Sequence, residues 1–145
     1  MKRKAFALVL SLLLVFSMGV PSMANDVTVK INGEVLVTEV PAQIVNSRTV
    51  LPMRAVFEAL GATVQWVEAD RMIFATKDDS MIVMQIDVPK MTIDKASSEE
   101  KKVIELDLAP FIQDGRTLVP VRAAAEALDA KVEWDDTTRT VLITK

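Results

Sequence analysis

The chain has 145 residues, a formal net charge of −3, and neither histidine nor cysteine. Without these two residue types, Ser-His-Asp triads, Cys-His pairs and the usual zinc sites are excluded, and copper(II) has no imidazole ligand. The acidic balance argues against nucleic acid and anionic lipid as partners, because both require a basic surface.

The first 24 residues have the pattern of a secretory signal peptide. Residues 2–4 are basic, residues 5–16 are apolar apart from one serine, and residues 22–24 form a small-x-small cleavage site. The apolar run is short for a membrane span, with an uncleaved anchor as the alternative. Cleavage leaves 121 residues with 14 basic and 20 acidic side chains, a net charge of −6. We therefore expect a secreted protein of the cell envelope or exterior, with one domain over residues 25–145 and no membrane contact.

The processed chain begins with a predicted β-hairpin. Residues 27–31 alternate between apolar and polar side chains, Asn32-Gly33 follows, and residues 34–37 continue as a second strand. Asn-Gly between two such runs is the strongest short-range signal for a hairpin with a type I′ turn. Residues 91–95 resemble the first of these strands, but a polar stretch at residues 96–102 replaces the turn. We expect that stretch to be a solvated loop.

The central feature of the sequence is an internal repeat. The stretch from Arg48 to Trp66 returns 68 positions later, from Arg116 to Trp134. Continued to the C-terminus, the copies share 14 identities over 30 aligned positions without a gap. The repeat divides the chain into halves of about residues 26–88 and 89–145. One such unit is too small to bury its own apolar face, so we expect both halves to share one core.

Each copy is predicted to be a strand, a proline, a two-turn helix, a tight turn and a second strand. Pro52 and Pro120 end the first strand and suit the first turn of a helix. Gly61 can adopt the left-handed conformation that ends a helix, and Asp129 replaces it in the second copy. Apolar residues at i, i+3, i+4 and i+7 mark the buried helix face. They are Met53, Val56, Phe57 and Leu60, and then Val121, Ala124, Ala125 and Leu128.

Further alternating segments complete the predicted fold. They indicate strands at residues 71–75, 81–86, 103–108 and 140–144, separated by polar turns. The combination predicts the α+β class, with antiparallel β-sheets curled around two short helices.

The polar residues inside the repeat have a structural and a functional interpretation. Arg54 and Glu58, like Arg122 and Glu126, are four residues apart and can form an ion pair of low energetic value on the helix surface. The recurring arginine can instead bind the carbonyl groups of a neighbouring strand with its guanidinium fork. We favour these structural roles over ligand binding.

Trp66 and Trp134 lie on the apolar phase of their strands, beside Val64 and Val132. Core packing is the favoured interpretation, and a platform for stacking sugars is the alternative.

Only two paired carboxylates remain as candidates for acid–base chemistry or calcium binding. Asp78-Asp79 and Asp135-Asp136 lie in predicted turns, and neither pair has D-x-D-x-D-G spacing. No serine lies in a G-x-S-x-G or S-x-x-K motif, and no glycine-rich phosphate loop is present. We therefore predict no catalytic residue, no cofactor and no metal.

The pattern N/D-G-R-T-L-V-P-x-R-A, followed by E-A-L-G-A-x-V-x-W-D, resembles the copper amine oxidase-like N-terminal domain. The match is carried by residues 46–66 and 114–135, with Ser47 and Asp129 in place of usual glycines and Leu51-Pro52 in place of Val-Pro. The resemblance implies an exported, stalk-like, non-catalytic module with an antiparallel sheet curled around helix. It does not imply a copper site, since the chain also lacks the tyrosine from which the oxidases form their quinone cofactor.

Two functions follow as expectations. The first is an exported interaction or stalk module that binds a cell-wall component or an envelope protein. The alternative is a secreted binder of a small ligand or peptide, for example an inhibitor of an extracellular enzyme. It would make contact through sheet edges and the loop at residues 96–102. A small hydrolase is the least supported reading.

Overall fold

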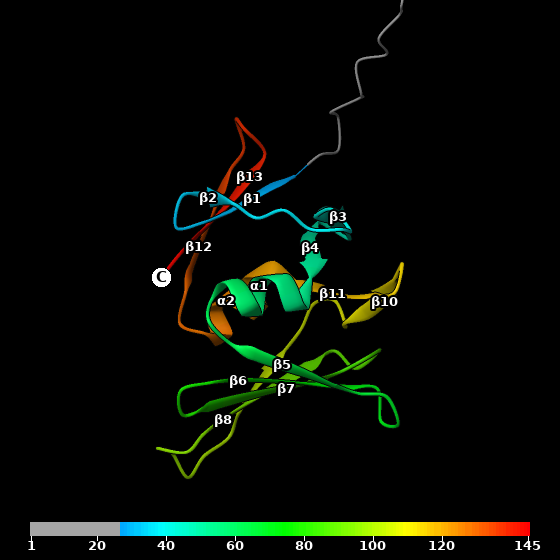
Figure 1. Ribbon diagram of the computed structural model, residues 1–145, viewed down its shortest axis with the longest axis vertical. Helices are drawn as coiled ribbons and strands as arrows, with labels where there is room; N and C mark the ends of the chain where they lie inside the picture. The colour runs from blue at the N-terminus through cyan, green and yellow to red at the C-terminus, as the bar shows by residue number, and fades with distance from the viewer. Residues whose placement is uncertain (1–26) are drawn as a thin grey trace, which may run out of the picture.

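The computed structural model describes residues 27–145, so the signal peptide predicted at residues 1–24 lies outside the described residues. Thirteen strands and two short α-helices make up this part of the chain (Figure 1). Neither helix in it has the length and apolar character of a membrane span. The first half contains β1 (Thr28–Ile31), β2 (Glu34–Val35), β3 (Gln43–Val45), β4 (Arg48–Pro52), α1 (Met53–Ala59), β5 (Thr63–Val67), β6 (Met72–Lys77) and β7 (Ser80–Gln85). The second half contains β8 (Lys90–Lys95), β9 (Lys102–Glu105), β10 (Phe111–Gln113), β11 (Arg116–Pro120), α2 (Val121–Ala127), β12 (Lys131–Asp135) and β13 (Thr140–Thr144).

The strands form three sheets, and each sheet takes strands from both halves. Their orders are β12-β13-β1-β2, β10-β11-β4-β3 and β5-β6-β7-β8-β9. Figure 1 shows the two helices lying between the first sheet at the top and the third sheet at the bottom. The predicted α+β class, with antiparallel sheets curled around two short helices, is confirmed.

The first and third sheets are built alike, except that the third has one additional strand. In the third sheet, β7 lies between β6 and β8 and pairs antiparallel with both. The first sheet has no counterpart of β7, so β1 pairs directly with β13, and this pairing is parallel. Each half therefore contributes its first hairpin to the sheet that contains the last strands of the other half.

The middle sheet joins the halves through β4 and β11, in which Leu51 lies opposite Val119. Its outer strands, β3 and β10, are not among the predicted strands. They have three residues each, which is too short to show a recognisable alternation. Both are defined by the turns that follow them, where Asn46 and Ser47 have φ of 48° and 63°. These angles suit the type I′ turn of a two-residue hairpin.

Two predicted strands are shorter than expected. The strand predicted at residues 103–108 ends at Glu105, and the one predicted at residues 34–37 ends at Val35. They are equivalent strands of the repeat, and their observed ends differ by two positions in the alignment. At both, the chain leaves an outer sheet to cross to the middle sheet, so the ladder cannot continue.

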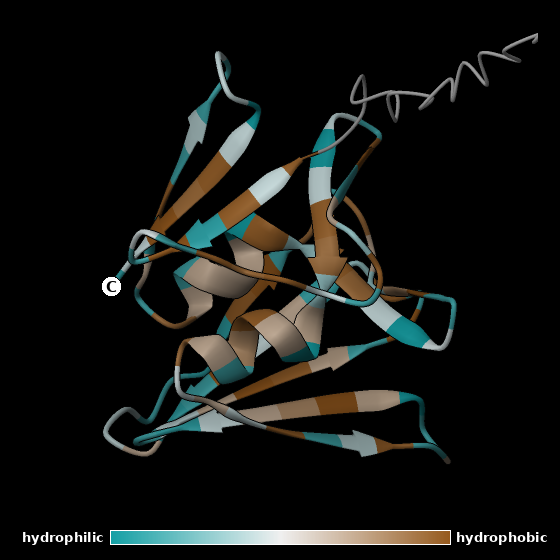
Figure 2. Ribbon diagram, turned by 45° about the horizontal axis from the view of Figure 1, so that its top comes forward, coloured by the Kyte–Doolittle hydropathy of each residue, from teal (hydrophilic) through white to brown (hydrophobic). Residues whose placement is uncertain are grey.

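The repeated unit folds as predicted. Each helix begins directly after its proline, and all eight residues of the predicted helix faces are buried. Gly61 and Asp129 have φ of 87° and 59°, the left-handed conformation expected at a helix end. One hydrophobic cluster contains residues of both helices and both outer sheets, which confirms the shared core. Figure 2 shows brown, hydrophobic segments in strands on both sides of the helices.

Candidate functional site

The helix arginines bind the edges of the outer sheets. Nη1 of Arg54 donates a hydrogen bond to the carbonyl oxygen of Val64 at 3.2 Å, and Arg122 contacts Val132 in the same way at 3.3 Å. Each arginine also pairs with the glutamate four residues later, Glu58 or Glu126. Because β5 and β12 are edge strands, each guanidinium occupies a carbonyl that an added strand would otherwise use.

Arg48 and Arg116, which begin the repeated stretches, form ion pairs between the halves. Nη2 of Arg48 lies 2.5 Å from Oδ2 of Asp107, and Arg116 pairs with Glu39. Glu39 and Asp107 are themselves 68 positions apart, so the second pair repeats the first with the halves exchanged. The sequence does not reveal this exchange, because the two acidic residues differ in type and lie outside the aligned stretch.

The two tryptophans have the same polar contact but different exposure. The indole N–H of Trp66 donates to Glu68 at 2.5 Å, and that of Trp134 donates to Asp136 at 3.3 Å. Trp66 packs against the core, whereas Trp134 is 38% exposed, so the prediction that Trp134 is a core residue is wrong.

The neighbouring strands give the physical reason for this difference. Trp66 lies in a cross-strand row with Ile73 and Met84. The corresponding row beside Trp134 consists of Val141 and Val29, whose smaller side chains cover less of the indole ring.

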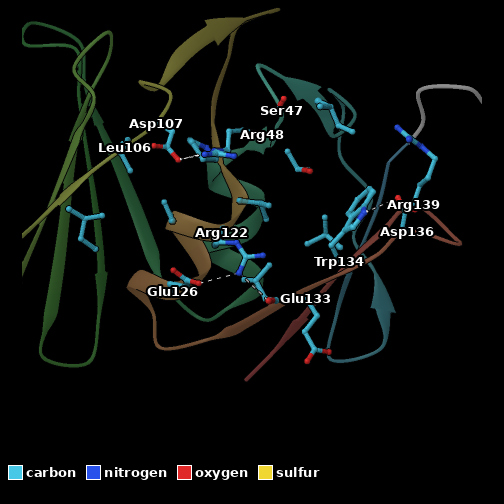
Figure 3. A pocket seen from close by; sticks show the side chains of 18 of the residues that line it. Ser47, Arg48, Leu106, Asp107, Arg122, Glu126, Glu133, Trp134, Asp136 and Arg139 are labelled. Carbon is cyan, nitrogen blue, oxygen red and sulfur yellow. Dashed lines mark hydrogen bonds and ion pairs between the residues drawn. The ribbon is translucent and has the colours of Figure 1, made fainter.

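A groove with a volume of about 740 Å³ opens beside Trp134. It is bounded by the segment that follows β9, the start of α2, the start of β4 and the β12–β13 hairpin. Its lining includes Arg48, Asp107, Arg122, Glu126, Trp134, Asp136 and Arg139. Figure 3 shows the pairs Arg48–Asp107 and Arg122–Glu126 on one side of the groove, and Trp134 with Arg139 on the other.

Arg139 lines the groove but is not among the site residues predicted from the sequence. It lies in the turn between β12 and β13 with φ of 49°, and its buried Nε has no hydrogen-bond partner among the described residues. The equivalent Arg71 pairs with Asp87, which lies between β7 and β8, at 3.4 Å. The first sheet has no counterpart of β7, and among residues 27–145 Arg139 forms no ion pair of this kind. The identity of Arg71 and Arg139 in the repeat alignment is the signal that could have found them.

The paired carboxylates are engaged in turns. Oδ2 of Asp79 accepts a hydrogen bond from Ser97 at 2.5 Å, and this bond lowers the pKa of the Asp79 carboxyl. Asp135 accepts from the backbone N–H of Thr137 at 3.0 Å, as expected for a turn-forming aspartate. Within residues 27–145, no group of three or more His, Cys, Asp or Glu side chains could hold a metal ion.

Comparison with known proteins gives the family. A family model described as the copper amine oxidase N-terminal domain matches residues 30–103 and again residues 97–145. The two matches together include both copies of the internal repeat. No curated protein matches the chain.

Proposed function

The chain belongs to the copper amine oxidase N-terminal domain family, a non-catalytic module, and from this we propose that it is an exported binding module of the cell envelope. We also propose that the protein as a whole is not an enzyme. Among the side chains available to it there is no histidine, cysteine or tyrosine. The pattern of residues 1–24 supports export.

The single observation that carries the binding role is the groove beside Trp134. Burial of an indole ring stabilises a folded protein, and Trp66 at the equivalent position is packed on the core. Trp134 instead remains 38% exposed in a groove that Arg139 also lines. Ligand sites typically combine an apolar concave surface with a few polar groups, and this groove has both.

Retention on isolated envelope material tests the proposal. The purified protein is mixed with isolated cell walls and, separately, with immobilised envelope proteins, and the bound fraction is measured by sedimentation or elution. We expect saturable retention on one of the two.

The repeat provides a matched pair of variants for this experiment. Ile44 and Ile112 occupy equivalent positions and are each 45% exposed, but only Ile44 lines the groove. Ile44→Arg places a large charged side chain in the groove and is expected to abolish retention, whereas Ile112→Arg should leave it unchanged. Failure of the wild-type protein to bind either material, or equal binding by both variants, would contradict the proposal.

The size of the groove favours a second candidate, a secreted binder of a small ligand. A volume of about 740 Å³ lies within the range of small-molecule pockets. This function predicts no retention on walls. It predicts instead a rise in the thermal unfolding midpoint with low-molecular-weight fractions of the culture medium. That rise should be lost in Ile44→Arg and kept in Ile112→Arg.

A further inference from the structure

We infer that the groove beside Trp134 binds an uncharged chain of pyranose sugars, with the indole ring of Trp134 as the stacking platform. This inference rests on the proposed function, because it names the ligand class of the same groove.

The indole ring offers its face rather than its N–H group. The N–H of Trp134 is already bonded to Asp136 at 3.3 Å, so the exposed part of the side chain is mainly apolar ring surface. A pyranose has an apolar C–H face and a rim of hydroxyl groups. A flat aromatic ring with polar groups around it matches both parts of such a ligand.

Ion pairs made by the lining carboxylates, two of them with lysines just outside the lining, balance the charge of the groove. Four of its five carboxylates have their own cation. The pairs are Asp107 with Arg48, Glu126 with Arg122, Glu105 with Lys90 at 3.8 Å, and Glu133 with Lys131 at 2.8 Å. The remaining groups, Asp136 and Arg139, have opposite charges. A polyanion or polycation therefore finds no surface of complementary charge, whereas an uncharged ligand does not need one.

Hydroxyl groups also suit the polar atoms that remain. The guanidinium group of Arg139 can donate hydrogen bonds, and the carboxylate of Asp136 can accept them; both residues line the groove. A sugar hydroxyl both donates and accepts, so neighbouring hydroxyls on one ring can satisfy both groups. An apolar ligand would make no hydrogen bond with either group.

A peptide strand fits this groove less well. Strand addition requires outward backbone groups on an edge strand. At β12, one of three edge strands that line the groove together with β3 and β9, the carbonyl of Val132 is already bonded to Arg122. Along β12, where Trp134 lies, the groove therefore favours recognition through side chains, as sugars require.

Tryptophan fluorescence gives a direct test, because the chain contains two tryptophans and no tyrosine. In Trp66→Phe, Trp134 is the sole indole fluorophore, and in Trp134→Phe it is Trp66. Both variants of the full chain are titrated with hexamers of N-acetylglucosamine, glucose and mannose. With at least one hexamer, we expect saturable changes in emission and protection from acrylamide quenching in Trp66→Phe only. No response to any hexamer in Trp66→Phe, or an equal response in both variants, would overturn the inference.

Binding to cell walls separates this inference from the proposed function. Trp134→Ala should weaken retention by at least about tenfold, and Trp134→Phe, which keeps an aromatic ring, should retain most of it. Undiminished retention of Trp134→Ala would refute the sugar platform and leave the envelope role intact. A hexamer response without any wall retention would refute the envelope role and support the sugar platform.

Discussion

At the scale of single residues, the arginine of each helix has two contacts of unequal value. Arg54 contacts both the Val64 carbonyl and the carboxylate of Glu58, but the ion pair is half exposed, with side-chain exposures of 52% and 53%. An exposed ion pair at this spacing contributes roughly 0.3–0.5 kcal/mol to the free energy of unfolding. The contact with the strand carbonyl is part-buried and contributes about 1 kcal/mol.

Substitutions can separate the two contacts. Arg54→Ala removes both and is expected to lower the free energy of unfolding by about 1–1.5 kcal/mol. Glu58→Gln removes only the ion pair and should cost less than about 0.5 kcal/mol. Urea unfolding measures both values. Equal losses in the two variants would show that the carbonyl contact adds nothing.

A second pair of residues, Lys77 and Lys145, binds the C-terminal ends of the two helices. Nζ of Lys77 donates to the carbonyl of Leu60 at 2.6 Å, and Nζ of Lys145 donates to that of Leu128; each leucine directly follows its helix. Proximity to the ammonium group of Lys77 is the main cause that lowers the pKa of Lys145, and desolvation adds to it. A lowered lysine pKa disfavours the folded state while the lysine is protonated. The penalty is therefore present below the lowered pKa and is relieved as pH rises toward 10.5, the ordinary value.

Lys77→Met should raise the pKa of Lys145 toward its ordinary value and reduce the alkaline rise in stability. NMR titration of the lysine side chains measures the first effect, and urea unfolding across the alkaline range measures the second. Lys131 is the internal control, because Glu133 raises its pKa at a separate site that this substitution does not touch. A Lys145 titration unchanged by the substitution would show that Lys77 does not influence it.

At the scale of elements, the ends of the helices differ between the copies. Gly61 and Asp129 occupy the same left-handed position, which is unfavourable for a residue with a side chain. A Cβ at Gly61 would meet Lys77 no closer than 3.6 Å, so conformation rather than space sets the cost of a substitution there.

Exchanging the two residue types should therefore have opposite effects. We expect Gly61→Ala to destabilise the protein by about 1 kcal/mol. Asp129→Gly should stabilise it by up to about 1 kcal/mol, since the lost ion pair with Lys95 is exposed. Thermal and urea unfolding measure both changes. Loss of stability in Asp129→Gly would mean that the ion pair outweighs the backbone strain.

Elements whose conformation is determined by residues adjacent in the sequence were predictable from the sequence. Asn32 and Gly33 adopt φ of 49° and 85°, as their type I′ turn requires, and the prolines and the glycine place the helix ends. The parallel pairing of β1 with β13 was not predictable, because it joins opposite ends of the chain. The exposure of Trp134 was missed for a related reason. It depends on the smaller side chains that this pairing places beside the indole ring, which no periodicity along one strand can reveal.

At the scale of the whole molecule, the halves cannot be separated without opening every sheet. Each sheet contains strands of both halves, and the hydrophobic cluster extends through both. We therefore expect one cooperative unfolding transition.

The single-tryptophan variants test this cooperativity, since Trp66 and Trp134 report on different halves. Within each variant, the urea midpoint from fluorescence should equal that from far-UV circular dichroism. Leu51→Ala, at a fully buried position of the first half, should cost about 2–5 kcal/mol and shift the Trp134 signal as much as the Trp66 signal. A Trp134 transition unaffected by this substitution would show that the halves unfold independently.

The exchanged hairpins have a final consequence. Two identical chains related by a symmetry axis carry any substitution twice, once on each face. Here both copies lie in one polypeptide, so opposite faces can specialise. The Arg71 face keeps its acidic partner and its packed indole, whereas on the Arg139 face the described residues provide neither. Duplication within a single chain thus allows one copy to keep its ion pair and its packed indole while the surface of the other copy changes.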